Sequence, residues 1–210
     1  MTLRRTVDIV GASLCLLLST PILLLTIAAI YLTDGRPIFF RQQRSGLLGR
    51  AFTIFKFRSM RINNLPCNAV TEIRAGHPLV TPVGDLIRRY KIDELPQLFN
   101  VLMGDMSLIG PRPTTPNQVE EFTPFQWRRQ EILPGLTGWA QINGGIDIGW
   151  PERIMLDVWY IDHRSLWLDA MILLRTVAVV LLGDQPNSER LIQAEYHAGR
   201  QEIALQQEAG

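Results

Sequence analysis

Residues 7–32 read VDIVGASLCLLLSTPILLLTIAAIYL, a run that is apolar almost throughout, with Asp8 near its start. A helix needs roughly 20 apolar residues to cross a bilayer, so this run is long enough to enter one. It is too long for the apolar core of a signal peptide and lacks a clear small-residue cleavage site. The run therefore predicts an N-terminal membrane segment, with a buried helix of a soluble protein as the alternative.

The centre of this run carries a helix-breaking signal, Ser19-Thr20-Pro21. Proline removes a backbone donor and clashes with the preceding turn, and neighbouring hydroxyls can bond the freed carbonyls at membrane depth. Basic residues flank the run on both sides: Arg4, Arg5, Arg36, Arg41 and Arg44. Because positive charge favours the cytoplasmic side, both ends are expected there. We predict a re-entrant helix-break-helix hairpin, with a single straight span as the alternative.

The bulk composition is that of one ordinary domain. The chain has 210 residues, 47% of them hydrophobic, and a net charge of +1, so its overall charge does not indicate nucleic-acid binding. Its two cysteines form no disulfide or metal pattern, which favours a protein with free thiols facing the cytosol.

A basic stretch follows the membrane segment. Residues 39–61 read FFRQQRSGLLGRAFTIFKFRSMR; the β-forming residues and the glycines Gly46 and Gly49 predict a β-hairpin. Lys56 and Arg58 lie within the apolar strand, and we interpret them as ligands for the phosphate groups of a substrate. The alternative is a juxtamembrane patch that meets anionic lipid headgroups. Residues 62–80 are predicted to be a loop.

An acidic pair, Asp93 and Glu94, is the strongest candidate for chemistry. The apolar spacing predicts a helix that begins near Asp93 as its N-cap, which would keep both carboxylates ionised and favour phosphate nearby. With Arg88 just upstream, such carboxylates can hold Mg²⁺ or attack phosphorus. The alternative is a capped helix with solvated charges. Downstream, Arg112 stands between two prolines, which suits either a pre-placed phosphate ligand or a tight structural turn.

The second half of the chain is less decisive. Residues 134–145 read PGLTGWAQINGG, a glycine-rich loop that can close over a nucleotide or can bury Trp139 in the core. Residues 166–182 are apolar but contain Asp169 and Arg175, which favours an interfacial amphipathic helix over a second span. The fold class predicted overall is mainly α with a small β-hairpin. The expected divisions are a membrane hairpin at 1–34, a catalytic domain at the membrane interface at 35–183 and a polar helical tail at 184–210.

Four motifs together closely resemble the bacterial sugar transferase family, the monotopic phosphoglycosyl transferases. They are KFRSM (56–60), KIDELPQLFNVLMGDMSLIGPRP (91–113), PGLTGWAQ (134–141) and LDVWYI (156–161). Their order and spacing also match, nearly the whole chain is covered except the tail after residue 183, and the likeness is to the minimal catalytic form. One departure is Gly145, where the family commonly has arginine; it affects the nucleotide or sugar contacts more than the reaction.

The resemblance implies a two-step reaction. The aspartate matching Asp93 attacks a UDP-sugar, UMP leaves, and polyprenyl (undecaprenyl) phosphate then takes the phosphosugar to give a polyprenyl diphosphate sugar. It also implies Mg²⁺ at Asp93 and Glu94, phosphate contacts from Arg88 and Arg112, and a nucleotide loop. The loop residues are Thr137, Gly138, Trp139 and Gln141.

The implied place is the cytoplasmic face of a bacterial inner membrane, at the first membrane step of exopolysaccharide, O-antigen or glycoprotein synthesis. The expected partners are the two substrates, the membrane, and either a second copy of the chain or downstream glycosyltransferases, with no nucleic acid. Two other functions are weighed: a non-catalytic protein that binds nucleotide sugar or assembles a glycan complex, and a membrane-associated phosphatase or nucleotidase.

Overall fold

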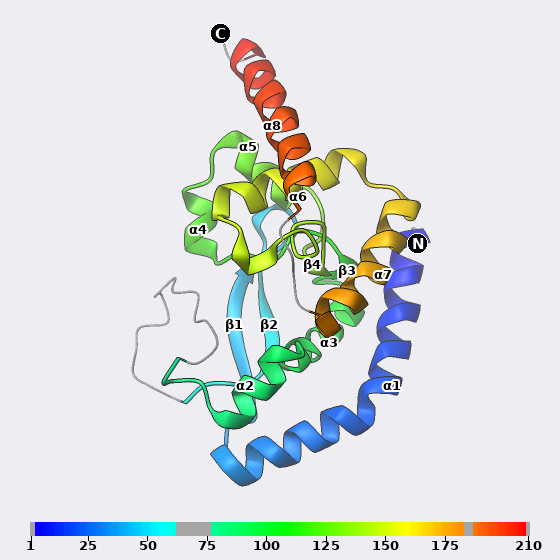
Figure 1. The fold of residues 1–210 in the computed structure, drawn as a ribbon, viewed down its shortest axis with the longest axis vertical. Helices are drawn as coiled ribbons and strands as arrows, with labels where there is room; N and C mark the ends of the chain where they lie inside the picture. Colours follow the sequence, from blue (N-terminus) through cyan, green and yellow to red (C-terminus); the bar gives the residue numbers. More distant parts are fainter. Residues whose placement is uncertain (1–2, 62–76, 183–186, 209–210) are drawn as a thin grey trace.

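The computed structural model describes residues 3–61, 77–182 and 187–208. Most of them are helical, and a small antiparallel hairpin stands beside the helices, so the fold class predicted from the sequence is confirmed at this level (Figure 1). Most of the loop predicted at 62–80 lies outside the described residues, as does Cys67.

The apolar N-terminal run forms one long helix, α1 (Leu3–Asp34), with Pro21 inside it. Figure 1 shows that α1 changes direction partway along its length, and proline is a usual cause of such a bend. Thr20 Oγ1 donates to the Leu16 carbonyl at 2.8 Å and Ser19 Oγ at 3.4 Å, so the hydroxyls bond one turn back along the bent helix. The structure thus has a continuous bent helix at the predicted break.

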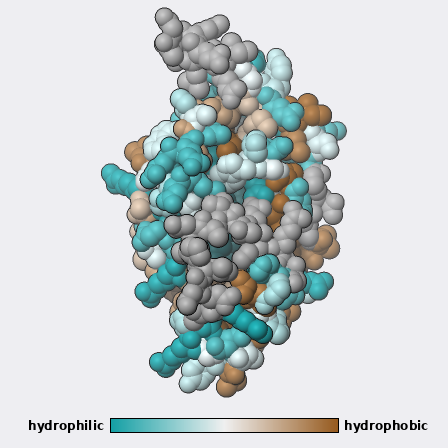
Figure 2. Space-filling view, turned by 90° about the vertical axis from the view of Figure 1, so that its left-hand side faces the viewer, coloured by the Kyte–Doolittle hydropathy of each residue, from teal (hydrophilic) through white to brown (hydrophobic). Residues whose placement is uncertain are grey.

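Most of the α1 surface is apolar and exposed, and within the described residues α1 is the helix long and apolar enough to cross a membrane. Its leucines are among the most exposed side chains: Leu14, Leu17, Leu18, Leu24 and Leu25. By contrast, Figure 2 shows a mostly hydrophilic face on the side of the molecule away from the N-terminal half of α1. An apolar helix exposed on a body with a hydrophilic face is what membrane association requires.

The N-terminal half of α1 is fixed to the body by polar contacts. Arg4 Nε pairs with Asp169 Oδ2 at 2.9 Å, on a later helix, and Arg5 donates to two carbonyls at the end of α3 (Gln97–Met103). Asp8, although buried, accepts hydrogen bonds of 2.8 Å from Ser107 Oγ and from the Leu108 backbone N–H. These charge-assisted bonds, most of them partly buried, hold the start of α1 against the domain.

The C-terminal half of α1 docks on the same body by apolar packing. Ile30 is fully buried against Phe57 and Ile87. Phe57 ends β2 (Ala51–Phe57), which pairs antiparallel with β1 (Phe39–Ser45), and Ile87 belongs to α2 (Pro82–Arg89). The hairpin turn passes through a short 3₁₀ turn, η1 (Leu47–Gly49), so the predicted hairpin is confirmed.

The acidic pair does not begin a helix, and the predicted N-cap at Asp93 is wrong. Asp93 and Glu94 lie in a 3₁₀ turn, η2 (Ile92–Glu94), entered through Lys91 at φ 56°. The helix α3 starts only at Gln97, with Pro96 in its N-cap position. Because Pro96 has no N–H, the chain makes one tight turn before the regular helix, and this turn carries the pair.

The remaining elements form the far side of the body. A short parallel pair, β3 (Ser107–Ile109) and β4 (Gly135–Thr137), was not predicted. The other elements are α4 (Pro116–Glu120), α5 (Pro124–Trp127), η3 (Arg128–Gln130), η4 (Gly145–Asp147), α6 (Trp150–His163), α7 (Leu166–Leu182) and α8 (Ser188–Glu208). Within the region expected as a polar tail, α8 packs against α6 and buries Ala194 and Ala198.

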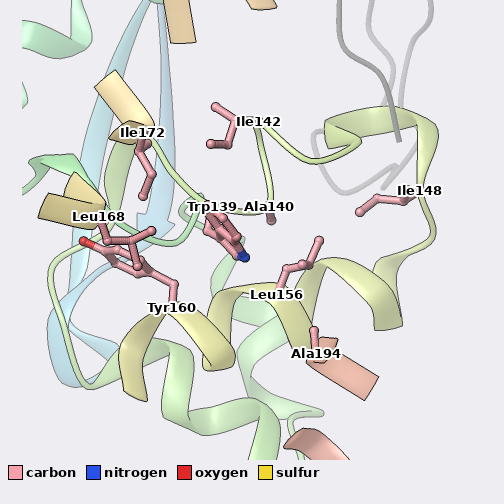
Figure 3. Close-up of a cluster of buried hydrophobic side chains, with 9 residues drawn as sticks. All are labelled: Trp139, Ala140, Ile142, Ile148, Leu156, Tyr160, Leu168, Ile172 and Ala194. Atoms are coloured by element: carbon pink, nitrogen blue, oxygen red, sulfur yellow. The ribbon is translucent and has the colours of Figure 1, made fainter. Parts of the chain in front are cut away.

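The main core lies between α6, α7 and the segment after β4. Figure 3 shows its nine buried side chains converging around Trp139. Trp139 stacks on Trp159 with ring centroids 5.1 Å apart. The outer face of α7 stays apolar and exposed, with Trp167 and Leu174 among its exposed residues, as an interfacial helix requires.

Candidate active site

Three separate parts of the chain meet at the acidic pair. Lys56 comes from β2, Asp93 and Glu94 come from η2, and Arg112 comes from the segment after β3. All four residues were predicted from the sequence, and the structure brings them together.

Glu94 is held by two cations. Its Oε1 accepts a hydrogen bond of 2.7 Å from Lys56 Nζ, and Arg112 reaches both carboxylate oxygens, with Nη1 3.1 Å from Oε2 and Nη2 bonded to Oε1. Burial alone would raise the pKa of Glu94, but Arg112 and Lys56 overcome it and hold this pKa well below its usual range. Glu94 is therefore an ionised, fixed anchor for two basic side chains.

Asp93 is placed differently although it is the next residue. It is 9% exposed, and within the described part of the chain no hydrogen bond reaches its carboxylate. Burial, and then the negative charge of Glu94, raise the pKa of Asp93 to about 6, while Lys56, Arg88 and Arg112 oppose the shift. At neutral pH this carboxylate is ionised, poorly hydrated and not engaged by the protein, which is what a nucleophile or a metal ligand needs.

Arg112 is positioned through its backbone as well. Its carbonyl accepts a hydrogen bond of 3.1 Å from Arg129 Nη2, and Arg129 is itself fixed by a buried ion pair, Nη2 to Asp157 Oδ2 at 2.7 Å. The flanking prolines are buried. These contacts support the Arg112 backbone, and whether Arg112 binds phosphate stays a prediction. Arg129 and Asp157 were missed, because an arginine 17 positions away gives no local signal for such a contact.

The two other predicted phosphate ligands lie at different distances from the pair. Arg88, on α2, is near enough for its charge to lower the pKa of Asp93. Arg58 faces the end of α1, where Nη2 donates to the carbonyls of Asp34 at 2.7 Å and Gly35 at 2.9 Å. The structure therefore does not bring Arg58 into contact with the acidic pair.

The predicted nucleotide loop is built into the body of the protein. Trp139 is 1% exposed, which favours the expectation that it fills the core. Thr137 Oγ1 lies 2.7 Å from Thr176 Oγ1 on α7. Gly138 packs on the Gly110 carbonyl so closely that a Cβ would lie 2.2 Å from that oxygen. The loop thus abuts the segment that leads to Arg112. Its predicted contact with a nucleotide, which includes Gln141, stays a prediction.

Of the two acidic side chains, only Asp93 has a carboxylate placed to bind Mg²⁺. Magnesium is commonly held by one or two carboxylates together with substrate phosphates and water. Asp93 offers such a carboxylate, whereas both oxygens of Glu94 are bonded to Lys56 and Arg112. Within the described residues there is no group of three or more His, Cys, Asp or Glu side chains placed to hold a metal.

Comparison with known proteins identifies the family to which the chain is similar. The family model described as bacterial sugar transferase matches residues 1–183. The uncharacterized sugar transferase EpsL of Bacillus subtilis (strain 168) is 43% identical over 210 residues, covering 97% of this chain and all of the relative.

Two longer relatives carry more specific names. The UDP-N-acetylgalactosamine-undecaprenyl-phosphate N-acetylgalactosaminephosphotransferase of Aeromonas hydrophila is 41% identical over 187 residues, 86% of this chain and 44% of the relative. The UDP-glucose:undecaprenyl-phosphate glucose-1-phosphate transferase of Escherichia coli (strain K12) is 39% identical over 188 residues, 83% of this chain and 39% of the relative. The chain thus spans less than half the length of these two relatives. It belongs to the bacterial sugar transferase family.

Proposed function

We propose that this protein transfers a sugar phosphate from a UDP-sugar to polyprenyl (undecaprenyl) phosphate, through a covalent aspartyl phosphosugar intermediate on Asp93. The observation that carries the proposal is the contrast within the acidic pair. Glu94 is locked between Lys56 and Arg112, while Asp93, next to it, is buried, ionisable near pH 6 and not hydrogen-bonded within the described residues. The undecaprenyl-phosphate substrates in the relatives' names support the choice of acceptor.

The first step is an in-line displacement at phosphorus. An oxygen of the Asp93 carboxylate attacks the β-phosphorus of the UDP-sugar, the bond from that phosphorus to the bridging oxygen breaks, and UMP leaves with the bonding electrons. The sugar phosphate is then joined to the enzyme as an acyl phosphate. Burial favours this attack because a poorly hydrated carboxylate has little water to shed.

The second step reverses the first with a different partner. An oxygen of the lipid phosphate attacks the same phosphorus, the bond to Asp93 breaks, and the carboxylate is regenerated. The product is a polyprenyl diphosphate sugar. No oxidant, reductant or net proton change at the enzyme is required, which suits a site built only from carboxylates and fixed cations.

The fixed cations supply electrostatic stabilisation. Charge gathers on the phosphate oxygens as the bonds change, and Lys56 and Arg112 are held in place beforehand by Glu94. Arg88 adds positive charge on the α2 side of Asp93. When bound, Mg²⁺ would be held by Asp93 and would neutralise charge on the diphosphate. Glu94 would contribute by holding Lys56 and Arg112 in place.

The docking of α1 supports a proposal for the membrane geometry. Both halves of the bent helix contact the same body, through Asp8 at one end and Ile30 at the other, and the surface between them is apolar. We propose that α1 enters the bilayer and returns as a re-entrant hairpin, so that residues 1–34 anchor a catalytic domain at the cytoplasmic face of a bacterial inner membrane. There a soluble nucleotide sugar and a lipid phosphate reach one site.

The test is release of UMP by the purified full chain in nonionic detergent. UDP-sugars are screened with and without undecaprenyl phosphate and Mg²⁺. We expect one sugar class to give UMP in proportion to lipid-linked product. UMP or free sugar phosphate formed at the same rate without lipid would favour a phosphatase or nucleotidase. Binding of nucleotide sugar with no product from any sugar would favour a non-catalytic assembly role.

A further inference from the structure

A second basic site lies where α1 meets the catalytic body. A pocket of about 210 Å³, here called the arginine pocket, opens at this place. Its lining residues are Asp34, Arg36, Arg58, Met60, Arg61 and Thr81. Three arginines against one aspartate give the lining a net charge of two positive units, which suits a phosphate group rather than a neutral ligand.

Two buried polar atoms at this pocket have no hydrogen-bond partner among the described residues. Arg58 is 7% exposed, and its Nη2 is used by the end of α1, yet its Nε is buried with no hydrogen bond among the described residues. Oδ2 of Asp34 is also buried without a hydrogen bond to any described residue. Buried polar groups are normally bonded, so a guanidinium donor left over in a basic pocket indicates a ligand that accepts hydrogen bonds.

The arginine pocket is linked to the catalytic pair through the β-hairpin. The β-ladder extends past β2, because the Arg58 N–H donates to the Ile38 carbonyl at 2.8 Å. Lys56 and Arg58 are two residues apart on this ladder, so they project to the same side, with Cα atoms roughly 7 Å apart. Lys56 holds Glu94. A phosphate held at Arg58 would therefore lie two residues along the ladder from the lysine that holds Glu94.

The arginine pocket is also next to the membrane segment. Asp34 is the last residue of α1, the helix that enters the bilayer in the proposed function, and Arg36 follows it. A ligand that reaches this pocket from the lipid side would pass the end of the apolar helix. The donor nucleotide has a different set of cations available, Arg112 and Arg88, which act on Asp93 and do not line the arginine pocket.

We propose that the arginine pocket binds the phosphate monoester of the lipid acceptor and positions it for the second step. This inference rests on the proposed function. Arg36 and Arg61 are exposed, so replacing them should leave the fold intact, whereas Arg58 also caps the end of α1.

The test uses Arg36→Gln with Arg61→Gln in the full chain. The matched control is Arg41→Gln with Arg50→Gln, two exposed arginines of the same hairpin that do not line the pocket. Steady-state KM values are measured for undecaprenyl phosphate and for the UDP-sugar that gives most UMP, in nonionic micelles. We expect the pocket variant to raise the acceptor KM by about tenfold or more, because two charge-assisted contacts are lost, and to change the donor KM by less than about twofold. The control should leave both unchanged.

Other outcomes would overturn the inference without touching the proposed function. A rise in the donor KM alone would assign the pocket to the nucleotide sugar. If the control variant raises the acceptor KM as much as the pocket variant does, the pocket arginines act only as surface charge. Phosphatidylglycerol added to the micelles of the parent protein should not compete; if it raises the acceptor KM as much as the substitutions do, the pocket takes any anionic headgroup. Absence of UMP from the parent protein would instead remove the proposed function itself.

Discussion

Lys56 and Glu94 are 38 positions apart, yet Lys56 Nζ donates to Glu94 Oε1 at 2.7 Å from inside a half-buried strand. Burial lowers the pKa of the Lys56 ammonium, and the neighbouring carboxylate opposes that shift. The pair ties the hairpin to the 3₁₀ turn that carries Asp93. The nucleophile proposed here therefore depends for its position and its pKa on a contact between two distant segments.

The pKa of Asp93 predicts how activity depends on pH. The attacking form is the ionised carboxylate, so kcat/KM should rise with pH through about 6 and level off above it. Glu94→Gln removes the negative charge that helps to raise this pKa, so in that variant the acidic limb should move to lower pH, although the overall rate falls. A pH profile of UMP formation for both proteins checks this. An acidic limb that stays in place or moves upward in the variant would show that Glu94 does not act on Asp93 in this way.

The same shift predicts that Asp93 reduces stability at neutral pH. Its folded-state pKa is raised above the unfolded value, so the protonated form favours folding at low pH and that advantage is lost as pH rises through about 6. Asp93→Asn should therefore increase the free energy of unfolding at pH 7.5 by about 1–3 kcal/mol, and by less at pH 4.

Chemical denaturation of the two proteins in the same detergent measures this difference. Glu94→Gln is the matched comparison and should be destabilising, because Lys56 and Arg112 lose their partner. If the Asp93→Asn protein is no more stable than the parent at pH 7.5, the pKa of Asp93 is not raised in the folded protein.

Arg112 and Arg88 should not tolerate lysine. Arg112 engages both oxygens of Glu94 with two nitrogens, a geometry that a single ammonium cannot reproduce. We expect Arg112→Lys to lower kcat/KM by about 10- to 100-fold and Arg88→Lys to lower it by less, with Arg50→Lys, on the exposed hairpin turn, as the control. Parent-like kinetics in both variants would mean that these arginines contribute only surface charge.

The topology of α1 can be tested by thiol labelling. A single cysteine is introduced by Thr2→Cys in a Cys15→Ala and Cys67→Ala background. We expect no labelling of intact cells by a membrane-impermeant reagent, because both ends of α1 should face the cytoplasm. A second variant carries Pro21→Leu with Ser19→Ala and Thr20→Ala, which favours a straight helix and should increase labelling. Labelling of the otherwise unmodified chain would mean that α1 crosses the bilayer.

The sequence predicted those parts of the fold that have strong local patterns. The apolar run at 7–32 and the hairpin around Gly46 and Gly49 were found from residue type and spacing. The closeness of Arg112 to the acidic pair was implied by the family resemblance. The helix start at Asp93 was predicted wrongly, because Pro96 can occupy either the first turn of a helix or the position before it. Local rules do not decide between these two.

Long-range contacts could not be predicted. Asp8 bonds Leu108 across 100 positions, and Arg129, which is fixed by Asp157, donates to the Arg112 backbone carbonyl. Neither contact leaves a periodic or compositional signal, because each depends on how separate elements pack. The same applies to Trp139, whose burial in the core was one of two interpretations that its glycine-rich surroundings allowed.

The covalent intermediate on Asp93 is tested most directly by the mass of the enzyme after reaction with donor alone. The full chain is mixed with Mg²⁺ and the UDP-sugar that supports transfer, without lipid, quenched in acid and digested. We predict one equivalent of UMP at most and a sugar-phosphate adduct on the peptide that contains Asp93, discharged when undecaprenyl phosphate is added before the quench. Asp93→Asn should give neither adduct nor UMP while still binding the nucleotide sugar. Transfer by the parent protein that proceeds with no adduct, or an Asp93→Asn protein that keeps more than a few per cent of the activity, would contradict this prediction.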